Sequence, residues 1–299
     1  MGAALFSKNR VTVLGVLNVT PDSFSDGGRF VGPAATSLEL DLEGAVEAGC
    51  SLARAGANVV DIGGESTRPG SDEVSVAIEI QRTVPVIESL LKRFASSEYS
   101  SRGNVPEISI DTQKAEVAEA ALRAGASIVN DVSGLSRDPK IARVAADAGA
   151  WLILGHMRGQ PKSMQDAPCF ENVVNEVGDD LQVSVDRAIR AGVPREKIVI
   201  DPGLGFGKTA EDSYRLLANL DALRSRLQLP LLIGASRKSF LGSVTGAAVE
   251  DRTAASHAAD AVAVFLGAEA IRVHEVAGAI QVAAVGRALR SVANAEGGH

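Results

Sequence analysis

Residues 55–64, AGANVVDIGG, place a small-residue turn, a short apolar run and a polar residue in direct succession. Glycine is favoured just after a helix because it accepts the left-handed backbone of a helix cap. An unbroken run of β-branched and aliphatic residues is typical of a strand that is covered on both faces. The same pattern returns at residues 124–134, 148–157, 191–203 and 266–276. Each copy therefore predicts the end of a helix followed by a buried strand.

Three further apolar runs bring the number of predicted strands to eight. The eight segments are residues 11–17, 57–62, 105–111, 127–130, 151–155, 197–201, 230–235 and 269–274. Helical patterns fill the intervals, as in residues 113–124 and 212–227, where the apolar positions share one face. Strands that alternate with helices indicate parallel strands joined by right-handed crossovers. We predict an α/β protein, a single (β/α)8 TIM barrel whose active site lies at the carboxyl ends of the strands.

The predicted domain organisation is a lead-in over residues 1–10, one barrel over 11–292 and a flexible tail over 293–299. The length of 299 residues suits the ~250 residues of such a barrel plus modest loop insertions. A doubly wound open sheet is the alternative. It normally carries G-x-G-x-x-G after the first strand, where this chain has NVTPDSFSDGG at residues 18–28.

Composition narrows the class of partner. The chain has 30 Lys and Arg against 37 Asp and Glu, a formal net charge of −7, which argues against broad binding to nucleic acid or to an anionic membrane. Its two cysteines have no C-x-x-C spacing, so we expect neither a disulfide framework nor a zinc site. We find no apolar run of 18 residues and no targeting signal, and we expect a cytoplasmic protein with small-molecule substrates.

Polar residues follow the predicted strands at their carboxyl ends. They are Asn18, Asp61, Asp111, Asn130, Asp131, His156, Asp201, Lys238, Arg272 and His274. Any single one is explained equally well as a helix cap or an ion-pair partner. Burying several carboxylates with a lysine and an arginine in one barrel mouth is costly, so the whole set indicates a polar ligand that pairs with them.

Residues 201–209, DPGLGFGKT, have the GKT of a nucleotide-binding Walker A loop between a predicted strand and a predicted helix. The first glycine of that motif would fall at Pro202, which cannot adopt the same backbone, and Asp201 would bring a negative charge near the phosphates. We reject the nucleotide-binding interpretation. The three glycines instead suggest that a flat ligand approaches the backbone, with Asp201 aimed at an amidine-like group.

The motifs then resemble those of a known family, the dihydropteroate synthases. They are LNVTPDSFSDGG (17–28), DIGGESTRPG (61–70), SIDT (109–112), IVNDVSG (128–134), DPGLGFGK (201–208), GASRKSF (234–240) and RVHEV (272–276). The resemblance covers nearly the whole chain and implies the same barrel. It also implies the joining of 6-hydroxymethyl-7,8-dihydropterin pyrophosphate to p-aminobenzoate, which gives 7,8-dihydropteroate and pyrophosphate for folate synthesis.

The resemblance implies roles for individual residues. A carboxylate accepts two N–H groups from the pterin edge, which is the role implied for Asp201. The other implied pterin contacts are Asp111, Asn130, Lys238, Met157 and Phe206. The implied diphosphate contacts are Arg272, His274 and Asn18, with Ser236 or nearby backbone. The implied p-aminobenzoate contacts are Phe24, Thr67, Arg68, Pro69, Phe206 and Ser239.

The implied cofactor is Mg²⁺, contacted by Asn18 and held mainly by substrate phosphates. Carbon–oxygen cleavage would precede attack by the arylamine, with Asp111, Lys238, Asp26, Arg272 and His274 as the catalytic set. The loops 20–28 and 63–71 would close over the site. The resemblance further implies a homodimer, for which the alanine-rich segments 253–266 and 276–289 are the candidate interface, and sulfonamides as competitors of p-aminobenzoate.

Two other functions remain open. A pterin-binding methyltransferase barrel would need neither the diphosphate pair Arg272 and His274 nor the TPDSFSDGG loop. A catalytically silent paralogue should have lost parts of the loop motifs, which are intact here. A Schiff-base role for Lys238 fits poorly, since this lysine lies beyond its strand.

Overall fold

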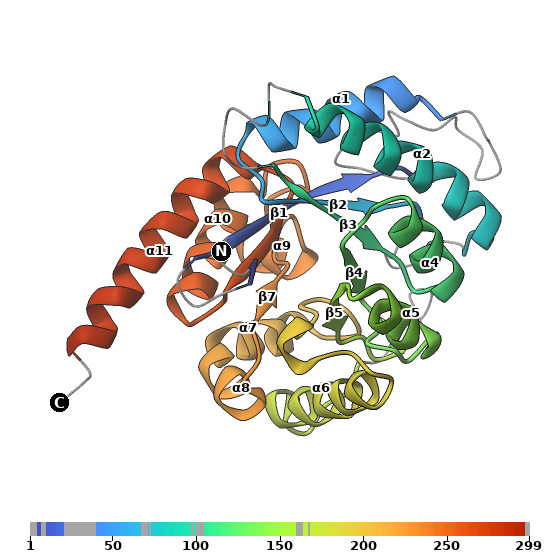
Figure 1. Ribbon diagram of the computed structural model, residues 1–299. Helices are drawn as coiled ribbons and strands as arrows, with labels where there is room; N and C mark the ends of the chain where they lie inside the picture. Colours follow the sequence, from blue (N-terminus) through green and yellow to red (C-terminus); the bar gives the residue numbers. More distant parts are fainter. Residues whose placement is uncertain are drawn as a thin grey trace.

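The sheet of this protein closes into a barrel of parallel strands (Figure 1). The computed structural model describes residues 5–6, 10–20, 40–66, 71, 73–96, 99, 105–159, 164–166 and 168–296. Within them, the strand order is β6-β5-β4-β3-β2-β1-β8-β7, and one parallel bridge between Ile200 and Leu231 brings β6 beside β7. The strands are β1 (Thr12–Asn18), β2 (Val59–Gly63), β3 (Glu107–Asp111), β4 (Ile128–Asp131), β5 (Trp151–Gly155), β6 (Ile198–Asp201), β7 (Leu232–Ile233) and β8 (Ala270–Val273).

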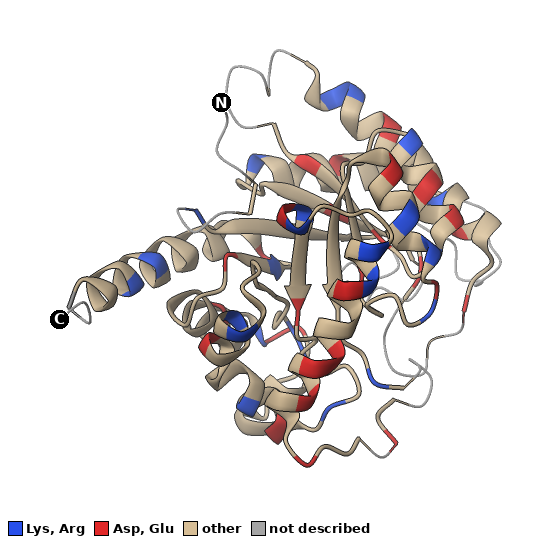
Figure 2. Ribbon diagram, turned by 60° about the horizontal axis from the view of Figure 1, so that its bottom comes forward, with Lys and Arg blue, Asp and Glu red and all other residues tan. Residues whose placement is uncertain are grey.

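Helices alternate with the strands and surround the barrel (Figure 1). They are α1 (Leu42–Arg54), α2 (Val76–Phe94), α4 (Ala115–Arg123), α5 (Lys140–Ala148), α6 (Val173–Arg190), α7 (Ala210–Ala218), α8 (Leu220–Leu227), α9 (Ser239–Thr245), α10 (Thr253–Phe265) and α11 (Val276–Glu296), with a 3-10 turn at Arg195–Lys197. Acidic and basic residues are interspersed over these outer helices (Figure 2).

Each strand overlaps the segment predicted for it, so the barrel prediction is confirmed. Helix α7 begins with a reciprocal capping box between Thr209 and Asp212. The prediction of one helix over residues 212–227 is wrong. Asn219 leaves the helical conformation (φ −124°, ψ 32°) and its side chain donates to the carbonyl of Arg215 at 2.7 Å, so the chain forms two helices.

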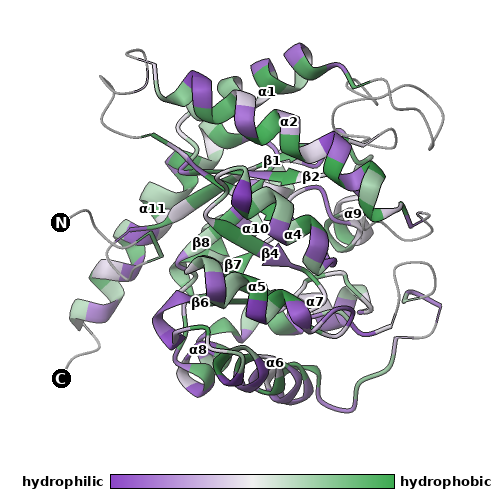
Figure 3. Cartoon of the chain, turned by 45° about the vertical axis from the view of Figure 1, so that its right-hand side comes forward, coloured by the Kyte–Doolittle hydropathy of each residue, from purple (hydrophilic) through white to green (hydrophobic). Residues whose placement is uncertain are grey.

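An apolar layer closes the amino end of the barrel. Its buried members come from seven of the eight strands and from the lead-in, and they are Phe6, Leu14, Val59, Ile128, Ile153, Val199, Leu232 and Ala270. The ring of Phe6 packs edge-on against Trp151, with 5.1 Å between ring centroids. The larger core lies between the strands and the helices, where the apolar strands are covered (Figure 3). The polar end of the barrel is therefore the opposite, carboxyl end.

Helix α11 packs against α10 and projects beyond the barrel at its carboxyl end (Figure 1). It continues to Glu296, past the boundary predicted at residue 292. In the part of the chain that the structure describes, its segment 276–295 has the length and composition of a membrane-spanning helix, although Arg287 and Arg290 interrupt its apolar residues. Val285, Leu289 and Val292 are exposed on it, whereas Ala279 and Ala283 are buried.

Candidate active site

A cavity of about 440 Å³ lies at the carboxyl ends of the strands. Strands β1, β3 and β8 contribute to it, together with the loops that follow β6 and β7. The described residues that line it are Val16, Asn18, Thr20, Glu65, Ser66, Asp111, Met164, Gln165, Gly205, Phe206, Ser236, Arg237, Lys238, Ser239, Val249, Arg252, Arg272 and His274. This is the barrel face where a (β/α)8 enzyme carries its active site.

Arg272, on β8, is held between two carboxylates. Its Nε donates to Oδ2 of Asp61 at 2.5 Å, and its Nη2 donates to Oδ2 of Asp111. Asn130 Nδ2 donates to the same Asp61 oxygen at 3.1 Å. Burial raises the pKa of Asp111 to about 7, with Arg272 opposing the shift and Asp61 adding to it.

One oxygen of each carboxylate is left without a hydrogen bond. Among the described residues, neither Asp61 Oδ1 nor Asp111 Oδ1 has a partner, although both atoms are buried. A buried acceptor without a donor is costly, and such atoms at a cavity indicate where a ligand binds. Asp111 lines the cavity, so a ligand that presents N–H groups or a positive charge suits its unpartnered oxygen.

Asp201, at the end of β6, and Lys238, in the loop after β7, influence each other electrostatically. Asp201 is buried, and its Oδ1 accepts the backbone N–H of Gly203 at 2.8 Å. Burial raises the pKa of Asp201 and lowers the pKa of Lys238 to about 8, and each group opposes the shift of the other. Lys238 Nζ donates to the carbonyl of Leu204 and lies 4.1 Å from the ring centroid of Phe206, a cation–π contact.

The glycines of the loop 201–208 serve mainly the packing of the loop. Gly203 (φ +66°) and Gly207 (φ +61°) lie so close to the carbonyls of His156 and Arg158 that a Cβ would meet those oxygens at 1.9 and 2.1 Å. Of the three glycines, Gly205 is the one that lines the cavity. The expectation that all three open the backbone to a flat ligand is therefore wrong for two of them.

The strand-end residues Arg272 and His274 both face the cavity, as their spacing predicts. Ser236 fixes His274 from the neighbouring strand end, since Ser236 Oγ lies 3.0 Å from His274 Nδ1 and accepts the backbone N–H of His274 at 3.3 Å. Arg252 also lines the cavity and was missed in the sequence. It lies before α10 in a stretch without a motif, and its guanidinium donates to the carbonyls of Ala247 and Arg237.

Asn18 ends β1 beside Gly63. A Cβ added to Gly63 would lie 3.6 Å from Asn18 Oδ1 and 3.7 Å from Cβ of Asp111. The glycine thus keeps open the space between an amide oxygen and a carboxylate, both of which are suitable Mg²⁺ ligands. No group of three or more His, Cys, Asp or Glu side chains in the described ranges is arranged to hold a metal ion. These residues therefore fit Mg²⁺ only if a ligand supplies further oxygens.

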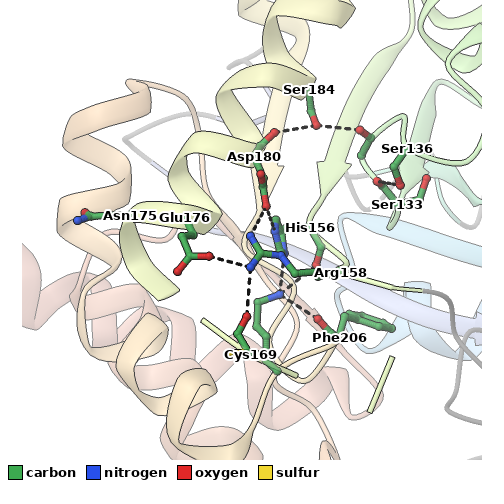
Figure 4. Close-up of polar contacts among 12 residues, drawn as sticks. Ser133, Ser136, His156, Arg158, Cys169, Asn175, Glu176, Asp180, Ser184 and Phe206 are labelled. Atoms are coloured by element: carbon green, nitrogen blue, oxygen red, sulfur yellow. Dashed lines mark hydrogen bonds and ion pairs between the residues drawn. The ribbon is translucent and has the colours of Figure 1, made fainter. Parts of the chain in front are cut away.

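Two of the predicted strand-end residues turn away from the cavity. Asp131 accepts the backbone N–H groups of Ser133 and Leu135 at 2.9 and 2.7 Å and so fixes the loop after β4. His156 faces α6, where its Nε2 lies 3.0 Å from Asp180 Oδ2 (Figure 4). The expectation that all ten residues converge on one ligand is wrong for these two.

The other predicted site residues divide into three groups. Ser239 and Phe206 line the cavity. Asn130, Asp201 and Met157 are buried and are not among the described lining residues. The predicted loop residues Phe24, Asp26, Thr67, Arg68 and Pro69 lie outside the described residues.

Comparison with known proteins identifies the relatives of this chain. The model of the family described as "Pterin binding enzyme" matches residues 14–274. A dihydropteroate synthase from Synechocystis sp. is 41% identical over 291 residues, which are 97% of this chain and 94% of the relative.

Two solved structures share the fold. A Yersinia pestis dihydropteroate synthase in complex with a sulfonamide drug has a TM-score of 0.84 and 38% identity, covering 95% of this chain and 96% of its own. A Xanthomonas albilineans dihydropteroate synthase in complex with 7,8-dihydropteroate has a TM-score of 0.77 and 37% identity, covering 95% of each chain. This chain belongs to the pterin-binding enzymes, as a member of their dihydropteroate synthase family.

Proposed function

We propose that this chain condenses 6-hydroxymethyl-7,8-dihydropterin pyrophosphate with p-aminobenzoate in the cavity at the carboxyl end of its barrel. The observation that carries the proposal is Arg272 between Asp61 and Asp111, which leaves one buried oxygen of each carboxylate unpartnered among the described residues, with Asp111 lining that cavity. The family's activity supplies the reaction, and the Xanthomonas albilineans relative was solved with its product, 7,8-dihydropteroate. The enzyme is accordingly a transferase of folate biosynthesis.

Four residues are proposed to bind the pterin. Asp201 would accept N–H groups of the aminopyrimidinone edge, because no described residue donates to its Oδ2 while its Oδ1 accepts the Gly203 amide. Asn130 and the free oxygen of Asp111 offer complementary polar groups from β4 and β3. Lys238 would donate to the ring from the opposite wall. Met157 and Phe206 complete the proposed pterin contacts.

The leaving diphosphate is proposed to bind near Arg272, His274 and Asn18. Arg272 and His274 lie two residues apart at the end of β8, and Ser236 orients the imidazole. Mg²⁺ would be held by Asn18 and by diphosphate oxygens, and it would neutralise charge on the departing group. Arg272 supplies a positive charge that two carboxylates keep in place, so it needs no reorganisation during the reaction.

The chemistry requires charge stabilisation more than a protein nucleophile. As the carbon–oxygen bond breaks, its electron pair leaves with the diphosphate and positive charge spreads over the dihydropterin. The carboxylates of Asp111 and Asp61 favour that cation electrostatically. The p-aminobenzoate amine then forms the new carbon–nitrogen bond and loses one proton.

For p-aminobenzoate, we propose a site formed by Phe206 and Ser239 together with Phe24, Thr67, Arg68 and Pro69. Phe206 and Ser239 line the cavity, next to Lys238. A flat aromatic acid suits a wall made of an aromatic ring and a hydroxyl. We propose the same site for sulfonamides, since the Yersinia pestis relative was solved with such a drug. We propose that Asp26 acts from the first loop, the segment 20–28. The other members of the proposed catalytic set are Asp111, Lys238, Arg272 and His274.

The assembly and domain organisation are also proposals. We propose one barrel domain over residues 11–292, a cytoplasmic location, and a homodimer formed through α10 and α11. Exposed apolar side chains on these helices support that interface; they are Val262, Phe265, Val285, Leu289 and Val292.

The test is a coupled assay of the purified protein with the dihydropterin pyrophosphate, p-aminobenzoate and Mg²⁺. Both pyrophosphate and 7,8-dihydropteroate should form, and Asp201→Ala should abolish both. Asp221→Ala, on the exposed surface of α8, is the matched control and should keep wild-type rates. Binding of the pterin without either product would contradict the proposal.

A further inference from the structure

A lysine lies buried behind the cavity wall, where the proposed reaction does not use it. Lys208 is 3% exposed, although it follows the loop whose Gly205 and Phe206 line the cavity. Its Nζ has three acceptors within reach: His156 Nδ1 at 2.8 Å, the His156 carbonyl at 3.2 Å and the Phe206 carbonyl at 3.0 Å. Three acceptors match the three hydrogens of an ammonium group.

The direction of the contact with His156 follows from its other ring nitrogen. Asp180 is a carboxylate, because its bonds to His156 and Arg158 lower its pKa to about 2. It can only accept, so His156 Nε2 carries the hydrogen at 3.0 Å from it (Figure 4). Burial and the charge of Lys208 lower the pKa of His156 to about 4, so the ring is neutral near pH 7. Nδ1 is then a bare acceptor for Lys208.

Asp180 itself is anchored from a second side. Arg158 donates to Asp180 Oδ2 and to Glu176 Oε2, both at 2.8 Å (Figure 4). Its guanidinium lies 4.1 Å from the ring centroid of Phe170. The carboxylate that sets the imidazole tautomer belongs to α6 and is thus held in place by Arg158. The charged groups around Lys208 are Asp180, Arg158, Asp201 and Lys238. Burial, Lys238 and Arg158 lower the pKa of Lys208, and Asp201 and Asp180 oppose that shift.

The chain of contacts ends at the cavity. Lys208 donates to the carbonyl of Phe206 from behind the wall, while Lys238 Nζ lies 4.1 Å from the Phe206 ring on the cavity side and donates to the Leu204 carbonyl. The two lysines therefore hold the same three-residue stretch from opposite sides. Removing either one frees a segment that forms part of the substrate surface.

We propose that Lys208 is a positioning residue of the substrate site. Its ammonium group donates to His156 Nδ1 and to the Phe206 carbonyl. The bond to the carbonyl sets the place of the Phe206 ring against Lys238. Lys208 touches no substrate in this arrangement. The inference rests on the proposed function for its kinetic readout, but the state of the imidazole can be measured without any activity.

The sharpest kinetic test is a pair of amide substitutions at His156, each of which mimics the position of one ring nitrogen. His156→Asn places an amide oxygen near the Nδ1 position and keeps an acceptor for Lys208, whereas His156→Gln places an amide N–H near the Nε2 position and loses that acceptor. We expect His156→Gln to raise the KM for p-aminobenzoate about tenfold, the effect of one lost buried hydrogen bond, and His156→Asn to change it much less. Equal effects of the two variants, or a larger effect of His156→Asn, would overturn the proposal.

Substitution of the lysine separates positioning from general stability. Lys208→Met fills the same space without donors, and Lys140→Met, exposed on α5, is the matched control. We expect a raised KM for p-aminobenzoate in Lys208→Met and none in the control. If the melting temperature falls while the KM of the folded fraction stays at the wild-type value, Lys208 has only a structural role and the proposal is wrong.

An NMR measurement tests the same contact in the free protein. The chain has four histidines, so their ring nitrogens can be followed in ¹⁵N-labelled enzyme as pH varies. We expect His156 with Nε2 protonated and Nδ1 bare, and a higher His156 pKa in Lys208→Met, because a positive charge beside Nδ1 is removed. A protonated Nδ1, or an unchanged pKa, would overturn the proposal even if the synthase activity is absent.

Discussion

Asp61 and Arg272 are 211 positions apart in the sequence, yet Arg272 Nε donates to Asp61 Oδ2 at 2.5 Å at the mouth of the barrel. The side chain of Asp61 is completely buried, and that of Arg272 is 16% exposed. Strands β2 and β8 pair with β1 on its two sides, so one strand separates the two that carry these side chains. The pair therefore ties the first part of the barrel to the last at the point where the proposed substrate binds.

The first prediction concerns the stability of this pair. Arg272→Met leaves the carboxylates of Asp61 and Asp111 buried without their counter-charge. We expect the free energy of unfolding at neutral pH to fall by about 3–5 kcal/mol, measured by urea denaturation. The double variant Arg272→Met/Asp61→Asn should recover part of that loss, because it removes one uncompensated charge. A loss below about 1 kcal/mol, as for an exposed pair, would contradict the burial argument.

The second prediction concerns the pH dependence of the reaction. In the free enzyme the pKa of Asp111 is about 7 and that of Lys238 about 8. Asp111 stabilises the pterin cation only when ionised, so kcat/KM should rise as pH increases through about 7. Lys238 donates more strongly when protonated, so kcat/KM should fall as pH increases through about 8.

The measurement is kcat/KM between pH 5.5 and 9.5, for the wild type and Lys238→Arg. An arginine stays protonated over this range. In Lys238→Arg, the decline of kcat/KM at high pH should therefore disappear, whereas the rise at low pH should remain. Because Asp111 interacts with Asp61 and Arg272, the two apparent pKa values belong to the coupled groups. A rate that is flat between pH 6 and 9 would be inconsistent with these assignments.

The third prediction separates backbone strain from steric contact at two glycines. Gly203 (φ +66°) and Gly149 (φ +61°) have nearly the same left-handed backbone, but an added Cβ meets the His156 carbonyl oxygen at 1.9 Å at Gly203 and nothing within 4 Å at Gly149. Gly149→Ala should cost only the left-handed penalty, about 1–2 kcal/mol. Gly203→Ala should cost clearly more in urea denaturation and should also weaken pterin binding, since Asp201 bonds to the Gly203 amide. Equal costs would show that the loop can shift away from His156.

The barrel was predictable because its signals are local and repeated. A turn, an apolar run and a polar residue recur around Asp61, Asn130 and Arg272, and every strand of the structure overlaps its predicted segment. The break at Asn219 was not predictable, because apolar residues continue on the same helical face on both sides of it. The spacing of apolar residues with a period of 3.6 does not reveal that a single residue leaves the helical conformation.

Prediction of the site was less complete because side-chain direction depends on neighbours far along the chain. His156 directly follows β5, at the carboxyl end of the barrel, yet α6 presents Asp180 to it and turns it away from the cavity. Arg272 was predicted as a diphosphate contact, and nothing near it in sequence reveals that it also binds Asp61 and Asp111. The roles of Arg272 and of the loop residues such as Arg68 stay predictions.

The last prediction concerns Asp260, a buried carboxyl on α10 that has no hydrogen-bond partner among the described residues. Burial raises its pKa to about 8, above its unfolded value near 4. The folded state therefore favours the protonated acid, so its contribution to stability is full below about pH 4 and is lost as pH rises to about 8. The free energy of unfolding should fall across that window by up to roughly 1.4 kcal/mol per pH unit from this one group.

Asp260→Leu should remove this slope and stabilise the protein at pH 8, because an apolar side chain needs no proton in that environment. The control is Asp221→Leu, at an exposed position of α8, where the slope should stay as in the wild type. The small cavity at Asp260 is also lined by His257 and Glu275, whose side chains lie 3.2 Å apart. The free energy of unfolding should therefore be measured by urea denaturation across the same pH range for His257→Leu as well. If the slope is lost in His257→Leu but kept in Asp260→Leu, the titrating group is the imidazole and the assignment to Asp260 is wrong.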